Sequence, residues 1–244
     1  DKTAYRIRFR HFIPRFRIIK EIYRVGLPAM LMETTEGVVF ALFNHDAAGF
    51  GSVVLAALGI AMRIGDLAFM PIIGTAHGML PIIGFSLGAK LWDRLWGTVK
   101  LTAISLTVIM LIATIFLEVF APQIVSIFDP DPALADIAIP GMRIFFSSLA
   151  IIGPTIIFVT TFQGLSKGKD AMVLSLARQF IFFVPALFSL SHYFGLMGVW
   201  IAMPVSDTLG MITATLWIAR EYRQQKKKFG RAEIEVLDQK VKGF

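Results

Sequence analysis

The chain has 244 residues, of which 56% are apolar and 12% aromatic, and its formal net charge is +7. This apolar content exceeds what the core of a soluble domain needs, so the composition favours an integral membrane protein. The cations gather at the edges of apolar stretches, where anionic membrane lipid is a nearer partner than nucleic acid. The sequence contains no cysteine, which excludes disulfides and thiolate chemistry.

Residues 1–20 predict a basic amphipathic segment, in which Arg and Lys alternate with Phe and Ile. They lack the apolar stretch of a cleavable signal peptide. Because the chain opens on Asp1 in the style of an internal loop, we expect a fragment of a longer polypeptide, with processing as the alternative. We therefore expect a cytoplasmic segment over 1–20, a membrane region over 21–220, and a cytoplasmic basic tail over 221–244 with at most a short charged helix.

Six apolar stretches are long enough to cross a bilayer as helices, which requires about 20 residues each. Nearly all Lys and Arg lie in every second connection, whereas the alternate connections, such as 44–46 and 129–132, contain neither residue. Cytoplasmic loops retain basic residues, so both termini are expected in the cytoplasm and the protein in the cell (inner) membrane. The fold class predicted is an all-α, six-helix transmembrane lobe, with helices over 22–44, 53–88, 97–119, 139–163, 171–192 and 196–219.

The second of these stretches is too long for a simple span, because 36 helical residues would extend about 54 Å. Pro71, Gly74, Gly78 and Pro81 predict a break in its second half. In lipid, a broken helix is tolerated where protein or a water-filled cavity covers the freed backbone groups. The broken helix either lines a cavity and moves, or is kinked and inert. Between the third and fourth spans, 121–138 predicts an interfacial helix followed by a turn.

Acidic residues inside a span are candidates for function, because an ionised side chain at the bilayer centre costs about 2.5–3.5 kcal/mol. Glu33 and Glu36 lie three residues apart in the first span and share a helix face. Two ionised carboxylates at this spacing repel, so they should share a proton or a cation. The pair predicts a proton or sodium relay, with protonated carboxyls that bond a neighbouring helix as the alternative.

Other polar residues in the spans allow two interpretations each. Asp207, with Pro204 one turn earlier, forms either an oxygen-lined spot for an ion or substrate, or a bend. Arg63 and Asp66 lie three residues apart, which favours a structural ion pair. His77 is either an interior group or a proton carrier. Arg178 could extend its charge to the membrane surface, and the sequence gives it no particular role.

The sequence contains no phosphate-binding loop, dinucleotide fingerprint, paired metal-ligand motif or nucleophile elbow. We therefore expect no enzyme, no cofactor and no metal centre. Energy from a gradient of H⁺ or Na⁺ fits these absences better than ATP hydrolysis, and Na⁺ would bind at Glu36.

Several short motifs lie along the chain from about residue 20 to 220. They are Gly26-Leu27-Pro28, Gly59-Ile60-Ala61 with Arg63, Leu67-Ala68-Phe69-Met70-Pro71, 81–90, Phe162-Gln163-Gly164 with Lys167-Gly168-Lys169, and Gly198-Val199-Trp200 with Pro204. Together these motifs resemble the C-terminal half of the MATE family of multidrug and toxic-compound extrusion transporters.

The resemblance implies two six-helix lobes that export cationic or amphiphilic compounds in exchange for protons or sodium, with a first lobe missing here. Glu36 falls where the NorM-like branch has a cation-coupling glutamate, whereas Ile156 and Ile157 stand where that branch has an acidic residue. This departure from the pattern predicts an incomplete second-lobe cation site, with coupling mainly in the missing first lobe as the alternative. Candidates for the cation and substrate site are Glu36, Glu33 and Asp207, and candidates for the cavity or its gate are Arg63, Asp66, His77, Pro71 and Gln163.

Three further possibilities follow from these predictions. A lipid-linked saccharide flippase of related fold would carry anionic cargo and favour cationic rows, whereas the charges at mid-membrane are mostly acidic. A non-transporting membrane scaffold would use its buried carboxylates to fix helix pairing. A single lobe also leaves a cavity-facing surface without a partner, so homodimerisation is the alternative to a missing N-terminal lobe.

Overall fold

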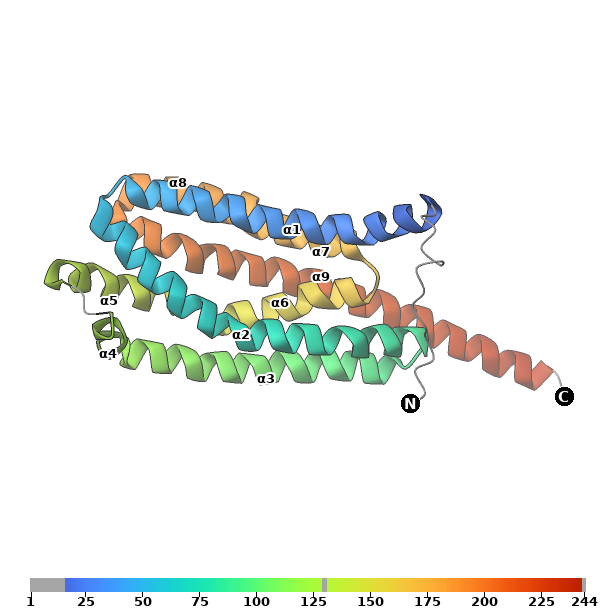
Figure 1. The fold of residues 1–244 in the computed structure, drawn as a ribbon. Coiled ribbons are helices and arrows are strands. Elements are labelled where there is room, and N and C mark those ends of the chain that lie inside the picture. Colours follow the sequence, from blue (N-terminus) through green and yellow to red (C-terminus); the bar gives the residue numbers. More distant parts are fainter. Residues whose placement is uncertain (1–15, 129–130, 243–244) are drawn as a thin grey trace, which may run out of the picture.

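The computed structural model describes residues 16–128 and 131–242, and all regular secondary structure in these ranges is helical. The helices lie along one another in an elongated bundle (Figure 1). The all-α fold class predicted from the sequence is confirmed. The elements are α1 (Phe16–Ala48), α2 (Ser52–Gly88), α3 (Trp92–Val119), α4 (Ala121–Ser126), α5 (Pro132–Phe146), α6 (Leu149–Gly164), α7 (Gly168–Leu176), the π-helix η2 (Ala177–Phe183), α8 (Val184–Phe194) and α9 (Leu196–Lys242).

By length and composition, four helical stretches of the described chain can cross a membrane: α2, α3, the stretch 168–194, and the stretch 196–227. The helices α5 and α6 form a fifth candidate, because together they pass the same criterion although they meet at 44°. The predicted first span corresponds to α1, whose 33 residues are long enough to cross, although α1 is not among the candidates that pass by both length and composition. The predicted segment 1–20 lies mostly outside the described residues.

The break predicted in the second span is wrong, whereas the kink of the alternative interpretation is present (Figure 1), and the second half of the helix lines a cavity through Ile73 and His77. Residues 52–88 form one continuous α-helix with Pro71 and Pro81 inside it, and α2 only changes direction part-way along (Figure 1). A proline removes one backbone hydrogen bond and kinks a helix, but packing on both sides of it can keep the helix intact. In α2 this packing comes from Ile72, Ala76, Met79 and Ile83, which are all buried.

The break lies instead in the fourth span, where α5 and α6 meet at 44° around Ser147 and Ser148. This span begins at Pro132, earlier than the predicted residue 139. The interfacial helix predicted over 121–138 is divided between the six-residue α4 and the first turns of α5. Ser148 lies at this bend, is buried, and takes part in the site described below.

The helix of the last predicted span does not end near residue 219, because α9 continues to Lys242. The short separate tail helix predicted from the sequence is therefore wrong in its boundaries. Residues 220–242 are rich in Arg, Glu, Gln and Lys, which are good helix formers, so the helix continues after the apolar stretch ends. Figure 1 shows the last turns of α9 projecting past the other helices.

The two ends of the bundle differ in charge. The α2–α3 and α6–α7 connections, which carry Lys90 and Lys167, lie at the end from which α9 projects (Figure 1). The α1–α2 and α8–α9 connections and the α4–α5 region lie at the opposite end (Figure 1). The alternation of basic and non-basic connections in the sequence therefore becomes a difference between two ends in space. Which end faces the cytoplasm stays a prediction.

Small residues allow the helices of the lobe to approach closely. Gly153 of α6 faces Leu106 and Met110 of α3, and an added Cβ there would lie 3.1 Å from Met110 Cγ. A Cβ on Gly141 of α5 would lie only 2.3 Å from the ring of Trp200 in α9. Membrane helices pack mainly by such close contact, because lipid supplies no hydrophobic drive between them. These contacts fix the frame that carries the polar residues of the interior.

Candidate functional site

Two cavities meet beside Glu36. The first encloses about 390 Å³ and the second about 480 Å³. Both are lined by Glu36, Ile73, Ile156 and Arg178, which come from α1, α2, α6 and η2. The side chains shared by the two linings therefore form the boundary between them.

Glu36 lies at this boundary with only one hydrogen-bond partner among the described residues. The amide Nε2 of Gln179 donates to its Oε1 over 3.3 Å, which is long for such a bond. Glu36 is exposed on the face of the isolated lobe, and Glu33 lies one turn earlier in the lining of the first cavity. Glu36 is thus an accessible carboxylate with most of its hydrogen-bonding capacity unused.

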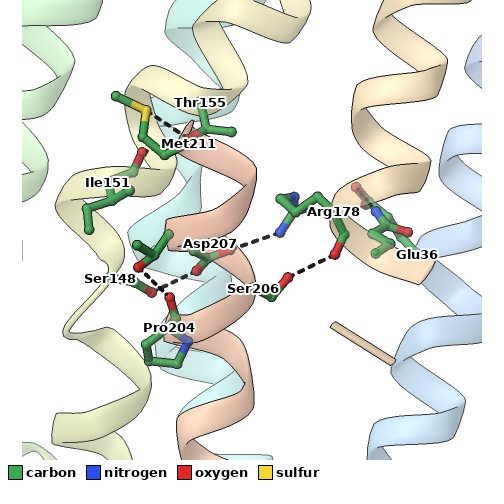
Figure 2. Close-up of polar contacts among 11 residues, drawn as sticks. Glu36, Ser148, Ile151, Thr155, Arg178, Pro204, Ser206, Asp207 and Met211 are labelled. Atoms are coloured by element: carbon green, nitrogen blue, oxygen red, sulfur yellow. Dashed lines mark hydrogen bonds and ion pairs between the residues drawn. The ribbon is translucent and has the colours of Figure 1, made fainter. Parts of the chain in front are cut away.

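Asp207 is the opposite case. It is 2% exposed, and Arg178 Nη1 lies 3.1 Å from its Oδ1. The hydroxyl of Ser148 donates to its Oδ2 over 2.7 Å, so both carboxylate oxygens have a donor (Figure 2). A buried ion pair with additional hydrogen bonds can persist in a low-dielectric interior. Asp207 is therefore held in a closed network and lies outside the linings of both cavities.

The π-helix η2 positions the two residues that contact these acids. Neighbouring residues of η2 reach in different directions: Arg178 contacts Asp207 on α9, and Gln179 contacts Glu36 on α1. A π-helix has a wider turn than an α-helix and is rare in proteins. Where one occurs, it is often at a functional site. Ser206 of α9 donates its hydroxyl to the carbonyl of Arg178 over 2.8 Å, which ties η2 to α9.

Glycine in α9 makes room for the arginine. An added Cβ on Gly210 would lie 2.9 Å from Arg178 Cγ. The aliphatic stem of Arg178 therefore crosses α9 at this glycine, and its guanidinium reaches Asp207 three residues earlier. Figure 2 shows Arg178 between Asp207 and Glu36, and its charge also acts on Glu36.

The structure brings some of the predicted residues together. Glu33, Glu36, His77 and Gln163 all line the first cavity. Asp66 lines the second cavity with Glu36. These five residues come from α1, α2 and α6, so the predicted cavity candidates largely share one region of the lobe.

Other candidates lie elsewhere. The ion pair predicted between Arg63 and Asp66 is absent from the described contacts, and both side chains are exposed on α2. A shared helix face brings two residues near each other, but the exposed side chains are free to extend apart. Arg63 and Pro71 lie outside the linings of the two cavities.

Sequence analysis missed Arg178 and Gln179. Arg178 does not extend its charge to the surface, because its side chain is only 17% exposed and pairs with Asp207. The available signal was the presence of a cation and an acid inside two different apolar spans, since buried charges in membranes usually pair. Ile156, where the resemblance implied an acidic residue, lines both cavities with an apolar side chain.

Comparison with known families identifies this arrangement. Residues 28–188 match the family described as MatE. The chain belongs to the MatE family. Relatives include the multidrug export protein MepA of Staphylococcus haemolyticus, 27% identical over 200 residues that cover 82% of this chain and 44% of that protein. MepA of Staphylococcus saprophyticus is 26% identical over 203 residues, which cover 83% of this chain and 45% of its own length.

Solved structures of this family have the same fold. An outward-facing multidrug resistance MATE family transporter of the MOP superfamily superimposes with a TM-score of 0.84 at 26% identity, covering 93% of this chain and 51% of that one. A MOP superfamily transporter from Pyrococcus furiosus, for which a reversed polarity of the binding pocket suggests a different function, gives a TM-score of 0.83 at 25% identity, covering 92% of this chain and 51% of its own. This MatE chain therefore spans about half the length of its relatives and has the fold of one half.

Proposed function

We propose that the chain forms one lobe of an ion-coupled antiporter that exports cationic or amphiphilic organic compounds by alternating access. A second six-helix lobe would complete the transporter, either as an N-terminal half or, as the alternative, as a second copy of this lobe. Membership of the MatE family, multidrug export by the MepA relatives and the half-length match support this proposal. Both termini and the basic end of the bundle would lie in the cytoplasm, as the positive-inside rule predicts.

The observation that carries the proposal is the state of Glu36. This carboxylate borders two cavities and has a single long hydrogen bond, whereas the other acid of the polar centre, Asp207, is neutralised by Arg178. The formal charges of Arg178 and Asp207 cancel within their ion pair. Of the three residues Glu36, Arg178 and Asp207, Glu36 therefore supplies the net negative charge beside the cavities. A negative group in a low-dielectric cleft attracts cations.

A coupling ion at Glu36 would find a second oxygen in Gln179. Gln179 is 4% exposed, and its buried Oε1 has no hydrogen-bond partner among the described residues. Buried polar atoms are seldom left without a partner, and Na⁺, like other hard cations, prefers oxygen ligands. The same carboxylate would take up H⁺ if the coupling ion is a proton. No further cofactor is required.

Transport would follow from competition at Glu36. With the coupling ion bound, the carboxylate is neutral and a cationic compound is released; without it, the charge attracts the compound. The two facing states need only differ in their affinity for the ion and for the compound, since such a difference shifts their populations. Glu33, His77, Asp66 and Gln163 would line the path, and Ile73 and Ile156 would contact apolar parts of the compound.

The test is Glu36→Gln in the full-length transporter, reconstituted in vesicles with an imposed H⁺ or Na⁺ gradient. We expect gradient-driven efflux of a fluorescent organic cation to fall at least about tenfold, the factor that corresponds to about 1.4 kcal/mol of lost interaction. Glu118→Gln is the matched control, because Glu118 is a partly exposed acid in the last turn of α3 that pairs with Arg143, away from the cavities. Unchanged efflux in Glu36→Gln would contradict the proposal, and absence of any ion-dependent flux in the wild type would favour a scaffold.

A further inference from the structure

A third hollow lies away from Glu36, in a groove of about 880 Å³ between α3 and α9. Its inner wall is apolar and includes Val99, Ala103, Phe158 and Ile218. None of its lining residues lines either of the Glu36 cavities. The groove is therefore a separate feature of the lobe, and the transport proposal does not use it.

One end of the groove is aromatic and basic. Trp92, Trp96, Tyr222, Lys100 and Lys226 line it, and the rings of Trp96 and Tyr222 meet edge to face with centroids 5.1 Å apart. These residues lie in the first turns of α3 and in the stretch of α9 that packs beside it, at the end that carries the basic connections (Figure 1). Tryptophan and tyrosine concentrate at the membrane–water interface, where their rings are apolar and their N–H and O–H groups are hydrated.

The two lysines of this groove have no acidic partner within the described part of the chain, unlike Lys167 beside them. Lys167 Nζ lies 2.6 Å from Glu221 Oε2, and Gln225 also donates to Glu221. Lys100 and Lys226 form no such contact with a described residue. Asp93 also lines the groove, so the formal charge of its lining is that of two cations and one anion, a net positive charge.

The outer surface of α3 beside the groove is apolar. Leu101 is 69% exposed and Ile112 is 63% exposed, and Ile104, which lines the groove, is also exposed. Such a surface suits contact with lipid hydrocarbon, and we infer that the groove opens toward the lipid. It therefore offers an apolar channel at bilayer depth that ends in cations and aromatic rings at the interface. Basic pockets between transmembrane helices of this kind bind anionic lipid headgroups.

We propose that the α3–α9 groove binds an anionic phospholipid, with the headgroup phosphate on Lys100 and Lys226 and an acyl chain along Ile104 and Phe158. Charge complementarity selects the anionic headgroup, and the apolar wall selects a lipid over a soluble anion. The lipid would fill the groove between α3 and the stretch of α9 that packs beside it. This assignment holds whether or not Glu36 couples transport to an ion.

The groove supplies its own reporter, because Trp92 and Trp96 line it. Full-length protein is reconstituted in phosphatidylcholine vesicles that contain a small fraction of brominated phosphatidylglycerol or, in parallel, the same fraction of brominated phosphatidylcholine. Bromine quenches tryptophan at short range. We expect phosphatidylglycerol to quench at least about twofold more, and we expect Trp96→Phe to remove a large part of this excess.

The decisive variants change the lysines. Lys100→Gln with Lys226→Gln should abolish the excess quenching, whereas Lys169→Gln with Lys227→Gln, which removes the same charge at the same end outside the groove, should preserve it. Equal quenching by both lipids, or an excess that survives the Lys100 and Lys226 changes, would overturn the proposal. Equal loss in both double variants would also overturn it, since it would indicate general attraction to a basic surface. Loss of the excess on adding soluble glycerol phosphate would indicate an anion site without a lipid.

Discussion

The centre of the lobe contains two acidic side chains in contrasting surroundings. Asp207 is buried, with a guanidinium on one oxygen and a hydroxyl on the other. Glu36 lies between two cavities and has one amide partner at 3.3 Å. The guanidinium that contacts Asp207 and the amide that contacts Glu36 belong to adjacent residues of the same π-helix, Arg178 and Gln179.

The contrast separates a structural role from a transport role. A carboxylate whose oxygens are all paired holds helices together, because a moving ion would have to replace those partners. A carboxylate with spare oxygen lone pairs beside open space can bind and release a ligand. The location of an acid at mid-span is therefore insufficient to assign function, and its hydrogen-bond partners decide.

The largest effect should come from Asp207→Ala. Removing one member of a buried ion pair leaves Arg178 as an uncompensated charge, which lowers the free energy of unfolding by about 3–5 kcal/mol. Replacing both members, with Asp207→Leu and Arg178→Met, should recover most of that loss. Thermal and denaturant unfolding of the full-length protein in detergent measures the free energy of unfolding of the single and the double variant. Glu36→Ala should change the free energy of unfolding by no more than about 0.5 kcal/mol, as for an exposed residue. A loss in Glu36→Ala as large as that in Asp207→Ala would remove the distinction between the two acids.

Ser148→Ala should have an intermediate effect. It removes the second donor to Asp207, and a hydrogen bond to a charged group contributes about 1.5–3 kcal/mol. Ser147→Ala is the matched control at the same bend, because the exposed Ser147 hydroxyl donates only to the carbonyl of Ile144, three residues earlier. The same unfolding measurements apply. Equal destabilisation by the two variants would mean that the α5–α6 bend, and not the Asp207 network, is being weakened.

Of these variants, Gln179→Leu should change the free energy of unfolding least. Its effect on transport should be confined to the dependence on the coupling ion. Its amide makes one long hydrogen bond and leaves a buried oxygen without a described partner, so an apolar side chain of similar size costs little. Loss of one ligand to the coupling ion should raise the ion concentration for half-maximal transport about 3–10-fold, equivalent to about 0.6–1.4 kcal/mol. Gln163→Leu, in the first cavity but without a described bond to Glu36, serves as the control. An unaltered ion dependence in Gln179→Leu would exclude the amide from the ion site.

Much of the site could be predicted from the sequence, but its connections could not. Glu33 and Glu36 are sequence candidates for the cation site and His77 and Gln163 for the cavity, and all four line one cavity. Gln179 lies 143 residues from Glu36, and Arg178 lies 29 residues from Asp207. No spacing rule relates residues on different helices, so the sequence alone assigns Arg178 no role and favours the local Arg63–Asp66 pair, which is absent among the described contacts.

The sequence by itself determined the helical class, most of the spans and the separation of basic from non-basic connections. These follow from properties of single segments, namely apolar length and the positions of Lys and Arg. The tertiary structure decided that α2 stays continuous despite Pro71 and Pro81, that the break lies at Ser148, and that Asp207 is paired while Glu36 is open. These outcomes depend on which side chains of neighbouring helices face each position, and that is fixed only when the helices pack.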